Sequence, residues 1–387
     1  MWIKTTLITL FALINLQAHA AQILIPMDDT QANHLKAYGI AYWVLQSGVE
    51  ISWMLNYKGG SFMFIQNPKF ESELKLRGVS YNVISEGQAN QIVSEILDPQ
   101  VNEDVVKLEK VPKICVYSPK DKRPWDDAVT LALTYAEIPY DIIYDEEIVQ
   151  GKLALYDWMH LHHEDFTGQY GKFYNMYRNA TWYQEQQRSM ESMAKQLGFA
   201  KVSQMKLAVA KRIKEFVAGG GFLFTMCSGT DTYDIALSAE GLDICESMYD
   251  GDGTTPSYND HLDFSKTFAF RNYTLSVNPL EYRFSNIDVT TTRRVPRDED
   301  VFTLFDFSAK WDPVPTMLCQ NHMQVIKGFM GQTTAFNKNY MKLNTYMVIL
   351  AREHGHFTEV TTRKTISTWL ATHQQTLIYI LIVRATD

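Results

Sequence analysis

The stretch GGGFLFTMCSGTDT, residues 219–232, decides the fold class of this chain. Its three glycines end a helical pattern, the apolar run FLFTM predicts a strand, and Cys227 follows where the next helical pattern begins. A strand that turns sharply into a helix exposes one side chain at the carboxyl edge of a sheet. The stretch therefore predicts an α/β fold with a cysteine at a strand–helix turn.

Short apolar strands alternate with helical patterns along most of the remaining chain. Strands are predicted at 23–26, 50–55, 80–85, 113–117, 140–144 and 157–162, and the two longest helices at 181–197 and 203–217. Because helical crossovers return the chain in the same direction, neighbouring strands are expected to pair in parallel. We predict an α/β protein with two doubly wound, mostly parallel-sheet domains of the flavodoxin-like type.

The polar segment 98–112 contains two prolines and is predicted to be a linker. The domains are therefore expected to divide near residue 110. The predicted organisation is a signal peptide at 1–20, an N-terminal α/β domain at 21–110, a second α/β domain at 111–340 and an atypical tail at 341–387.

The first 20 residues are typical of a secretory signal. Lys4 precedes the apolar run Leu7–Leu16, and Ala18-His19-Ala20 forms a small-x-small cleavage site. The run is too short to span a bilayer. We expect cleavage before Ala21 and an exported protein, periplasmic or secreted, with no stable membrane anchor.

Charge and composition narrow the classes of partner that this chain is expected to bind. The formal net charge is -8, and no cluster of lysine and arginine is long enough to follow a phosphate backbone, so nucleic acid is excluded as a partner. Aromatic residues make up 13% of the chain, and the tyrosines and tryptophans between Tyr156 and Tyr183 are candidates for lining a sugar or peptide groove. They are also ordinary core residues. The four cysteines are too few for a disulfide scaffold.

Cys227 is the candidate catalytic nucleophile. A helix N-terminus next to a thiol favours the thiolate, and the amides of Ser228 and Gly229 are placed to stabilise an oxyanion. The simpler interpretation is a packed thiol at the end of a strand.

The segment HLHHED, residues 160–165, follows the end of a predicted strand. A metal site there would use His160, His162 and Glu164, a donor set that suits zinc. A substrate-binding loop would use His162, His163, Glu164 and Asp165, and a purely structural role is the third interpretation. The carboxyl ends of parallel strands meet at one edge, so this segment is expected beside Cys227.

Residues 228–232, SGTDT, are similar to a pyrophosphate-binding loop but lack its second glycine. Capping of the next helix by Thr230, Asp231 or Thr232 explains the same residues.

Five runs of the chain resemble a family of exported bacterial proteins commonly labelled asparagine synthetase B. They are residues 24–62, 107–147, 156–174, 216–241 and 305–322. In layout, residues 113–340 also resemble the class I glutamine amidotransferase fold. That resemblance implies a nucleophile at Cys227 that pairs with a histidine near the end of the domain.

The family label itself implies a glutamine-dependent asparagine synthetase. Such an enzyme needs an N-terminal cysteine, whereas Trp2 follows the initiator and the exported chain would begin at Ala21. ATP is also scarce outside the cytoplasm. We interpret the family label as a name transferred from other proteins rather than as the activity of this chain.

The tail departs from the resemblance. Family members end in a segment of the type GKGTWTFYGGHDPEDYQH, and codons can be chosen for residues 344–369 whose shifted reading gives that segment. We predict a frameshift after about residue 340, which the gene sequence tests. His354 and His356 are then not the catalytic histidine.

The sequence thus predicts an amidotransferase-like amide hydrolase acting on a small polar, amide or sugar substrate. A non-catalytic module that binds glycan or protein, the asparagine synthetase of the label and a metal-dependent hydrolase stay open.

Overall fold

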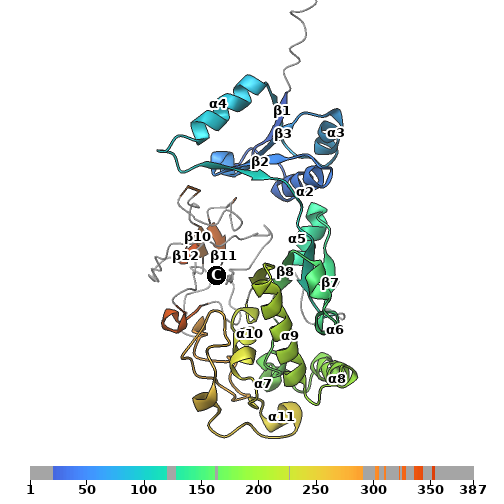
Figure 1. Cartoon of the computed structure of the whole chain (residues 1–387), viewed down its shortest axis with the longest axis vertical. Helices are drawn as coiled ribbons and strands as arrows, with labels where there is room; N and C mark the ends of the chain where they lie inside the picture. Colours follow the sequence, from blue (N-terminus) through green and yellow to red (C-terminus); the bar gives the residue numbers. More distant parts are fainter. Residues whose placement is uncertain are drawn as a thin grey trace, which may run out of the picture. The chain divides into compact units, whose positions relative to one another are not determined.

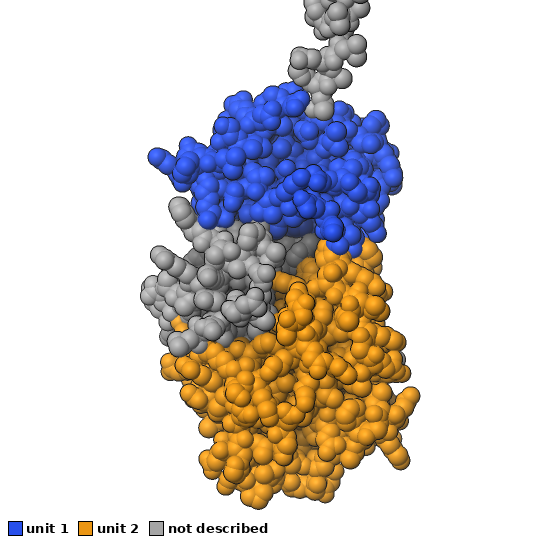
Figure 2. All heavy atoms as spheres, in the orientation of Figure 1, with its two compact units in different colours: residues 1–111, 135–138, 306–311 blue, residues 112–134, 139–305, 312–387 orange. Residues whose placement is uncertain are grey.

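The computed structural model describes residues 21–119, 128–161, 164–225, 227–290 and 335–342, together with short pieces at 301–304, 309–310, 322, 325–327 and 351–353. The chain divides into two compact units (Figure 2). Unit 1 is mainly the chain up to Val111, and unit 2 is mainly the chain from Pro112. The predicted signal at 1–20 and most of the tail at 341–387 lie outside the described residues.

Unit 1 is an antiparallel sheet with helices on both faces (Figure 1). The strand order is β4-β1-β3-β2-β5, and every neighbouring pair is antiparallel. The strands are β1 (Gln22–Ile25), β2 (Ile51–Leu55), β3 (Ser61–Ile65), β4 (Asn82–Ile84) and β5 (Asp104–Leu108), and the helices are α2 (His34–Gln46), α3 (Pro68–Leu76) and α4 (Glu86–Ile96).

Alternate residues of the central strands enter two separate cores. Ile23 and Phe64 pack with the apolar sides of α2 and α3. Leu24 and Met63 pack on the other side, with Ala89 of α4. Both faces of the sheet are therefore buried, and this explains why the strands have continuous apolar runs.

The prediction of a parallel sheet is wrong for unit 1. A strand buried on both faces has the same apolar run in a parallel as in an antiparallel sheet, so the pattern does not distinguish them. Here β3 lies between β1 and β2 and runs opposite to both. The predicted linker 98–112 is also partly wrong, because β5 lies inside it and pairs with β2.

Unit 2 is centred on a parallel sheet, as the sequence predicts. The strand order is β7-β6-β8-β9. The strands are β6 (Ile114–Tyr117), β7 (Asp141–Ile143), β8 (Trp158–Leu161) and β9 (Phe222–Thr225). Its helices are α5 (Ala128–Ala136), α6 (Asp145–Val149), α7 (Tyr174–Tyr177), α8 (Thr181–Gln196), α9 (Val202–Ala218), α10 (Gly229–Ser238) and α11 (Ser247–Asp250).

The long helix α9 forms one side of the unit 2 core. Its buried Met205 and Val209 belong to the same cluster as Met159 and Leu223 of the sheet and as Tyr233 of α10. Loops after α10 form a second cluster, and β10 (Val301–Leu304), β11 (Val325–Lys327) and β12 (Ala351–Glu353) make a small antiparallel sheet. Within the described ranges, no helix is both long and apolar enough to cross a membrane.

Asp234 of α10 holds the loop that follows it. Its carboxylate accepts the backbone N–H groups of Phe268 at 2.7 Å, Ala269 at 2.8 Å and Phe270 at 3.0 Å. The desolvation that comes with burial raises the pKa of this carboxyl to about 6, although the three N–H groups favour the charged form. One side chain therefore joins α10 to the second cluster.

A buried ion pair joins four parts of the chain at the carboxyl end of β6. The Lys206 ammonium of α9 lies 2.9 Å from an Asp145 carboxylate oxygen of α6, and neither side chain reaches solvent. The ammonium also donates to the hydroxyl of Tyr117 at 2.9 Å, and Tyr117 donates to Asp145. The ring of Phe166 lies 5.8 Å from the ammonium. β6, α6, α9 and the segment after β8 are thereby held together.

Removing one partner of this pair is expected to destabilise unit 2 strongly. Lys206→Met or Asp145→Asn leaves the other group buried without its counter-charge, which costs about 3 to 5 kcal/mol. The measurement is the opening free energy of the β6 amides by hydrogen–deuterium exchange.

The exposed pair Arg212–Glu215, at 2.7 Å on the same helix, is the matched control. Arg212→Ala should cost about 1 kcal/mol or less. The double variant of Lys206 and Asp145 should lose less than the sum of the single losses, and strict additivity would show that the two groups do not interact.

Candidate active site

Cys227 occupies a left-handed backbone conformation between β9 and α10. Its φ is 50°. β9 ends at Thr225 and α10 begins at Gly229, so the turn is only a few residues long. Thr230 holds this turn, because its N–H and its hydroxyl donate to the carbonyl of Cys227 at 3.0 and 2.6 Å. Seven other non-glycine residues in the described part of the chain also have a positive φ. A side chain in this conformation costs roughly 1 to 2 kcal/mol.

The Cys227 thiol is neutral at physiological pH. The residue keeps a partly exposed surface, but burial of the thiol raises its pKa to about 12, and the charges of Asp231 and Asp288 add to that rise. Hydrogen bonds from Ser228 act in the opposite direction and are too weak to reverse it. Desolvation and the two carboxylates therefore act against the thiolate that a helix N-terminus would favour.

Three further groups act on the Cys227 site, and the sequence signals only one of them, Asp231, as part of the pyrophosphate-like loop or as a helix cap. Asp231 is fully buried in the first turn of α10, and Asp288 is 4% exposed and accepts the N–H of Thr290 at 2.8 Å. Burial, Cys227 and Asp288 all raise the pKa of Tyr282. Asp288 and Tyr282 lie some 60 residues beyond Cys227 in an irregular segment, and no pattern signals their position.

The segment 160–165 is only partly described. His160 lies on β8 opposite Phe224 of β9, with ring centroids 5.3 Å apart, and is 1% exposed. His162 and His163 lie outside the described residues. The zinc site of His160, His162 and Glu164 and the substrate-binding role of the two histidines therefore stay predictions.

The structure brings Glu164 against the helix that follows Cys227. The hydroxyl of Thr232 donates to the Glu164 carbonyl at 2.9 Å. The adjacent Asp165 serves its own loop, because its carboxylate accepts the N–H and hydroxyl of Thr167, each at 2.6 Å, and the N–H of Gly171 at 3.0 Å. Glu164 is therefore at the predicted edge, while the contacts of Asp165 are those of a loop anchor.

Ser228, Gly229 and the three residues after them form the start of α10. Ser228 is the N-cap residue but makes no capping side-chain hydrogen bond, and Gly229 is the first helical residue. Thr230, Asp231 and Thr232 lie inside the first turn, so the interpretation of these three as caps is wrong. The Thr232 hydroxyl donates to the segment after β8, and the Thr230 hydroxyl donates to the turn itself.

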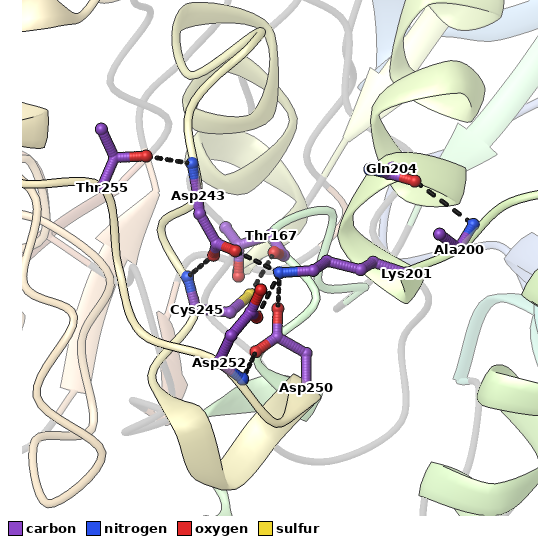
Figure 3. A network of polar contacts seen from close by, with 9 residues as sticks. All are labelled: Thr167, Ala200, Lys201, Gln204, Asp243, Cys245, Asp250, Asp252 and Thr255. Carbon is purple, nitrogen blue, oxygen red and sulfur yellow. Dashed lines mark hydrogen bonds and ion pairs between the residues drawn. The ribbon is translucent and has the colours of Figure 1, made fainter.

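A second polar cluster surrounds Lys201, at the start of α9 (Figure 3). The ammonium lies 3.1 Å from Asp250 and also pairs with Asp243 and Asp252. Cys245 lies beside these carboxylates, and its thiol donates to the carbonyl of Thr167 at 3.3 Å.

The Lys201 cluster has the donor types of a metal site. In the part of the chain that the structure describes, Asp243, Cys245 and Asp250 bring their donor atoms within 4.8 Å of one another. The Lys201 ammonium already pairs with three carboxylates there. Burial lowers the pKa of Lys201, but the three carboxylates raise it by more, so the net shift is upward. We interpret the cluster as an ionic network that joins the start of α9 to the loop 243–252.

The described cysteines are free thiols. Cys115 and Cys245 are buried, and burial raises the pKa of both. Cys319 lies outside the described residues.

Comparison with protein families, with curated proteins and with solved structures finds no match to this chain. The resemblance to the family labelled asparagine synthetase B therefore stays a prediction.

Alkylation of Cys227 by iodoacetamide is expected to be slow at pH 7 and to accelerate about tenfold per pH unit up to pH 9. The reason is that the thiolate reacts, and the pKa of about 12 leaves little of it at neutral pH. Peptide mass spectrometry of the labelled chain measures the rate at Cys227 separately from the other cysteines. A plateau near neutral pH would contradict the neutral thiol.

Proposed function

We propose that the chain is an exported, amidotransferase-like amide hydrolase with Cys227 as its nucleophile. The observation that carries the proposal is the left-handed backbone of Cys227 at a strand–helix turn. At a strand–helix elbow a nucleophile adopts such a strained turn, which exposes its side chain at the edge of the sheet.

The sheet order supports the proposal. Numbered from β6, the order β7-β6-β8-β9 is 2-1-3-4, which is the order of doubly wound flavodoxin-like sheets. In such sheets ligands bind at the carboxyl ends of the strands where the order reverses, here between β6 and β8. The segment that contains Glu164 follows β8 at that edge. The finer fold, of the class I glutamine amidotransferase type, is part of the proposal.

The reaction would use the turn in two ways. The thiol sulfur attacks the amide carbonyl carbon, the C–N bond breaks, and the amine leaves with the proton of the thiol; water then hydrolyses the thioester to the acid. The N–H groups of Ser228 and Gly229 at the start of α10 would stabilise the oxyanion. Because the thiol is neutral, a base must take its proton during the attack, and the resemblance assigns that base to a histidine of the native tail.

One observation favours a different class of protein. Burial, together with Asp231 and Asp288, raises the pKa of Cys227 to about 12, and an unreactive thiol is what a non-catalytic binding module would show. In that case the strained turn would position backbone groups for binding rather than a nucleophile.

Replacement of Cys227 distinguishes the hydrolase from the non-catalytic binding module. Cys227→Ala is expected to lower amide turnover by about a thousandfold or more, since loss of a nucleophile removes the covalent route. Turnover is measured as ammonia or amine release from glutamine, asparagine and N-acetylglucosamine, with the chain as given and with its tail after residue 340 replaced by the shifted-frame sequence. The second chain regains the histidine and should be the faster one.

Cys115→Ala is the matched control, because Cys115 lies in the core of the same sheet. It should keep the turnover of its parent chain. Equal turnover in Cys227→Ala and its parent, or no turnover in either parent, would contradict the proposal.

A further inference from the structure

An enclosed cavity of about 20 Å³ lies inside unit 2. Its polar lining comes from three parts of the chain. The segment after β8 supplies Glu164 and Asp165, which are 7% and 8% exposed, α8 supplies Gln186, and α9 supplies Lys206. A volume of this size holds a single ion or a single water molecule.

The loop 165–172 forms one wall of the cavity. The Asp165 carboxylate anchors this loop by accepting the N–H of Thr167 at 2.6 Å and the N–H of Gly171 at 3.0 Å. Three consecutive residues of the loop, 170–172, have left-handed φ values of 49°, 72° and 58°. Such backbone persists only where the surrounding structure fixes it, so this wall has one defined conformation.

Four buried side-chain oxygens around the loop have no hydrogen-bond partner among the described residues. They are Gln169 Oε1, Tyr183 Oη, Gln186 Oε1 and Tyr249 Oη. Gln186 lines the cavity, and Gln169 belongs to the loop. The rings of Tyr183 and Tyr249 each lie 6.2 Å from the ring of Tyr170, which also lines the cavity. Buried polar atoms nearly always have a partner, and an ion or a water supplies it where the chain does not.

The charges around the cavity favour an ion over a water. The Lys206 ammonium is balanced by Asp145, which lies 2.9 Å from it. Asp165 accepts hydrogen bonds only from N–H and hydroxyl groups within the described ranges. The nearby Lys172 ammonium donates to two backbone carbonyls instead. A buried carboxylate is costly without a counter-charge, and a cation in the cavity would supply one.

We propose that this cavity is a calcium site, with the carboxylates of Glu164 and Asp165 and the amide oxygen of Gln186 among its ligands. Calcium takes carboxylate and amide oxygens, the donor types of this lining. Magnesium usually keeps several of its waters, for which a cavity of about 20 Å³ has no room. The zinc site predicted from His160 and His162 is a different one, because it uses imidazole nitrogens.

Glu164 connects the cavity to the candidate active site. Its backbone carbonyl accepts the Thr232 hydroxyl of α10 at 2.9 Å, and α10 is the helix that begins after Cys227. Calcium bound to the Glu164 side chain would therefore hold the segment after β8 against that helix. This role is structural and does not depend on the proposed hydrolase function.

Isothermal titration of the full chain with calcium chloride, after removal of metals with EDTA and in a buffer that contains sodium chloride, tests the site. Wild type should bind calcium with a Kd of about 1 mM or tighter, and magnesium at least tenfold more weakly. Gln186→Leu should weaken the calcium Kd about tenfold or more, since even the loss of a group that orients a ligand costs that much. Gln186→Glu, which keeps an oxygen and adds a charge, should bind at least as tightly as wild type.

Gln187→Leu is the matched control, because it is the same substitution on the same helix and the Gln187 amide contacts Glu191 at the surface. It should leave the calcium Kd unchanged. So should Asp252→Asn, which removes an exposed carboxylate of the Lys201 cluster, and His162→Ala, which removes a ligand of the predicted zinc site.

Three results would overturn the calcium site. Absence of calcium binding by wild type would mean that the cavity holds an ordered water. An equal Kd in Gln186→Leu and wild type, or loss of binding in Asp252→Asn, would place the bound calcium elsewhere in the chain.

Discussion

The buried pair of Lys206 and Asp145 is the interaction on which the carboxyl edge of the parallel sheet depends. It joins α9 to α6 and, through Tyr117 and Phe166, to the end of β6 and the segment after β8. Two charges without access to water are stable only as a pair with further hydrogen bonds. The edge therefore has one well-defined arrangement, and this is the condition for placing reacting groups on it.

That arrangement connects the two parts of the candidate site. Phe166 is held by the ion pair, and Glu164, two residues earlier, accepts a hydrogen bond from Thr232 of α10. The helix that begins after Cys227 is thus fixed against the segment after β8. Burial at the same edge raises the pKa of Cys227, so the structure that orders the site also keeps its thiol neutral.

The sequence predicts unit 2 better than unit 1 for a physical reason. The stretch 219–232 contains glycines, an apolar strand and a cysteine turn, all local signals, and the structure has β9 and α10 there. The direction of β3 depends on pairing between distant strands, which apolar runs do not encode. Likewise, the rule that the carboxyl ends of parallel strands meet at one edge predicts that Glu164 lies near Cys227. Asp288 and Tyr282 belong to irregular loops, whose sequence has no periodic pattern that would predict their position.

The most direct test of the central claim compares Cys227→Gly with Cys227→Ala by chemical denaturation. The claim is that the turn holds a side chain at a φ of 50° at a cost in stability. Glycine relieves that strain, so the glycine variant should be more stable than the alanine variant by about 1 kcal/mol. At most other positions a protein with glycine is less stable than the same protein with alanine. A glycine variant less stable than the alanine variant would contradict the strained turn at Cys227.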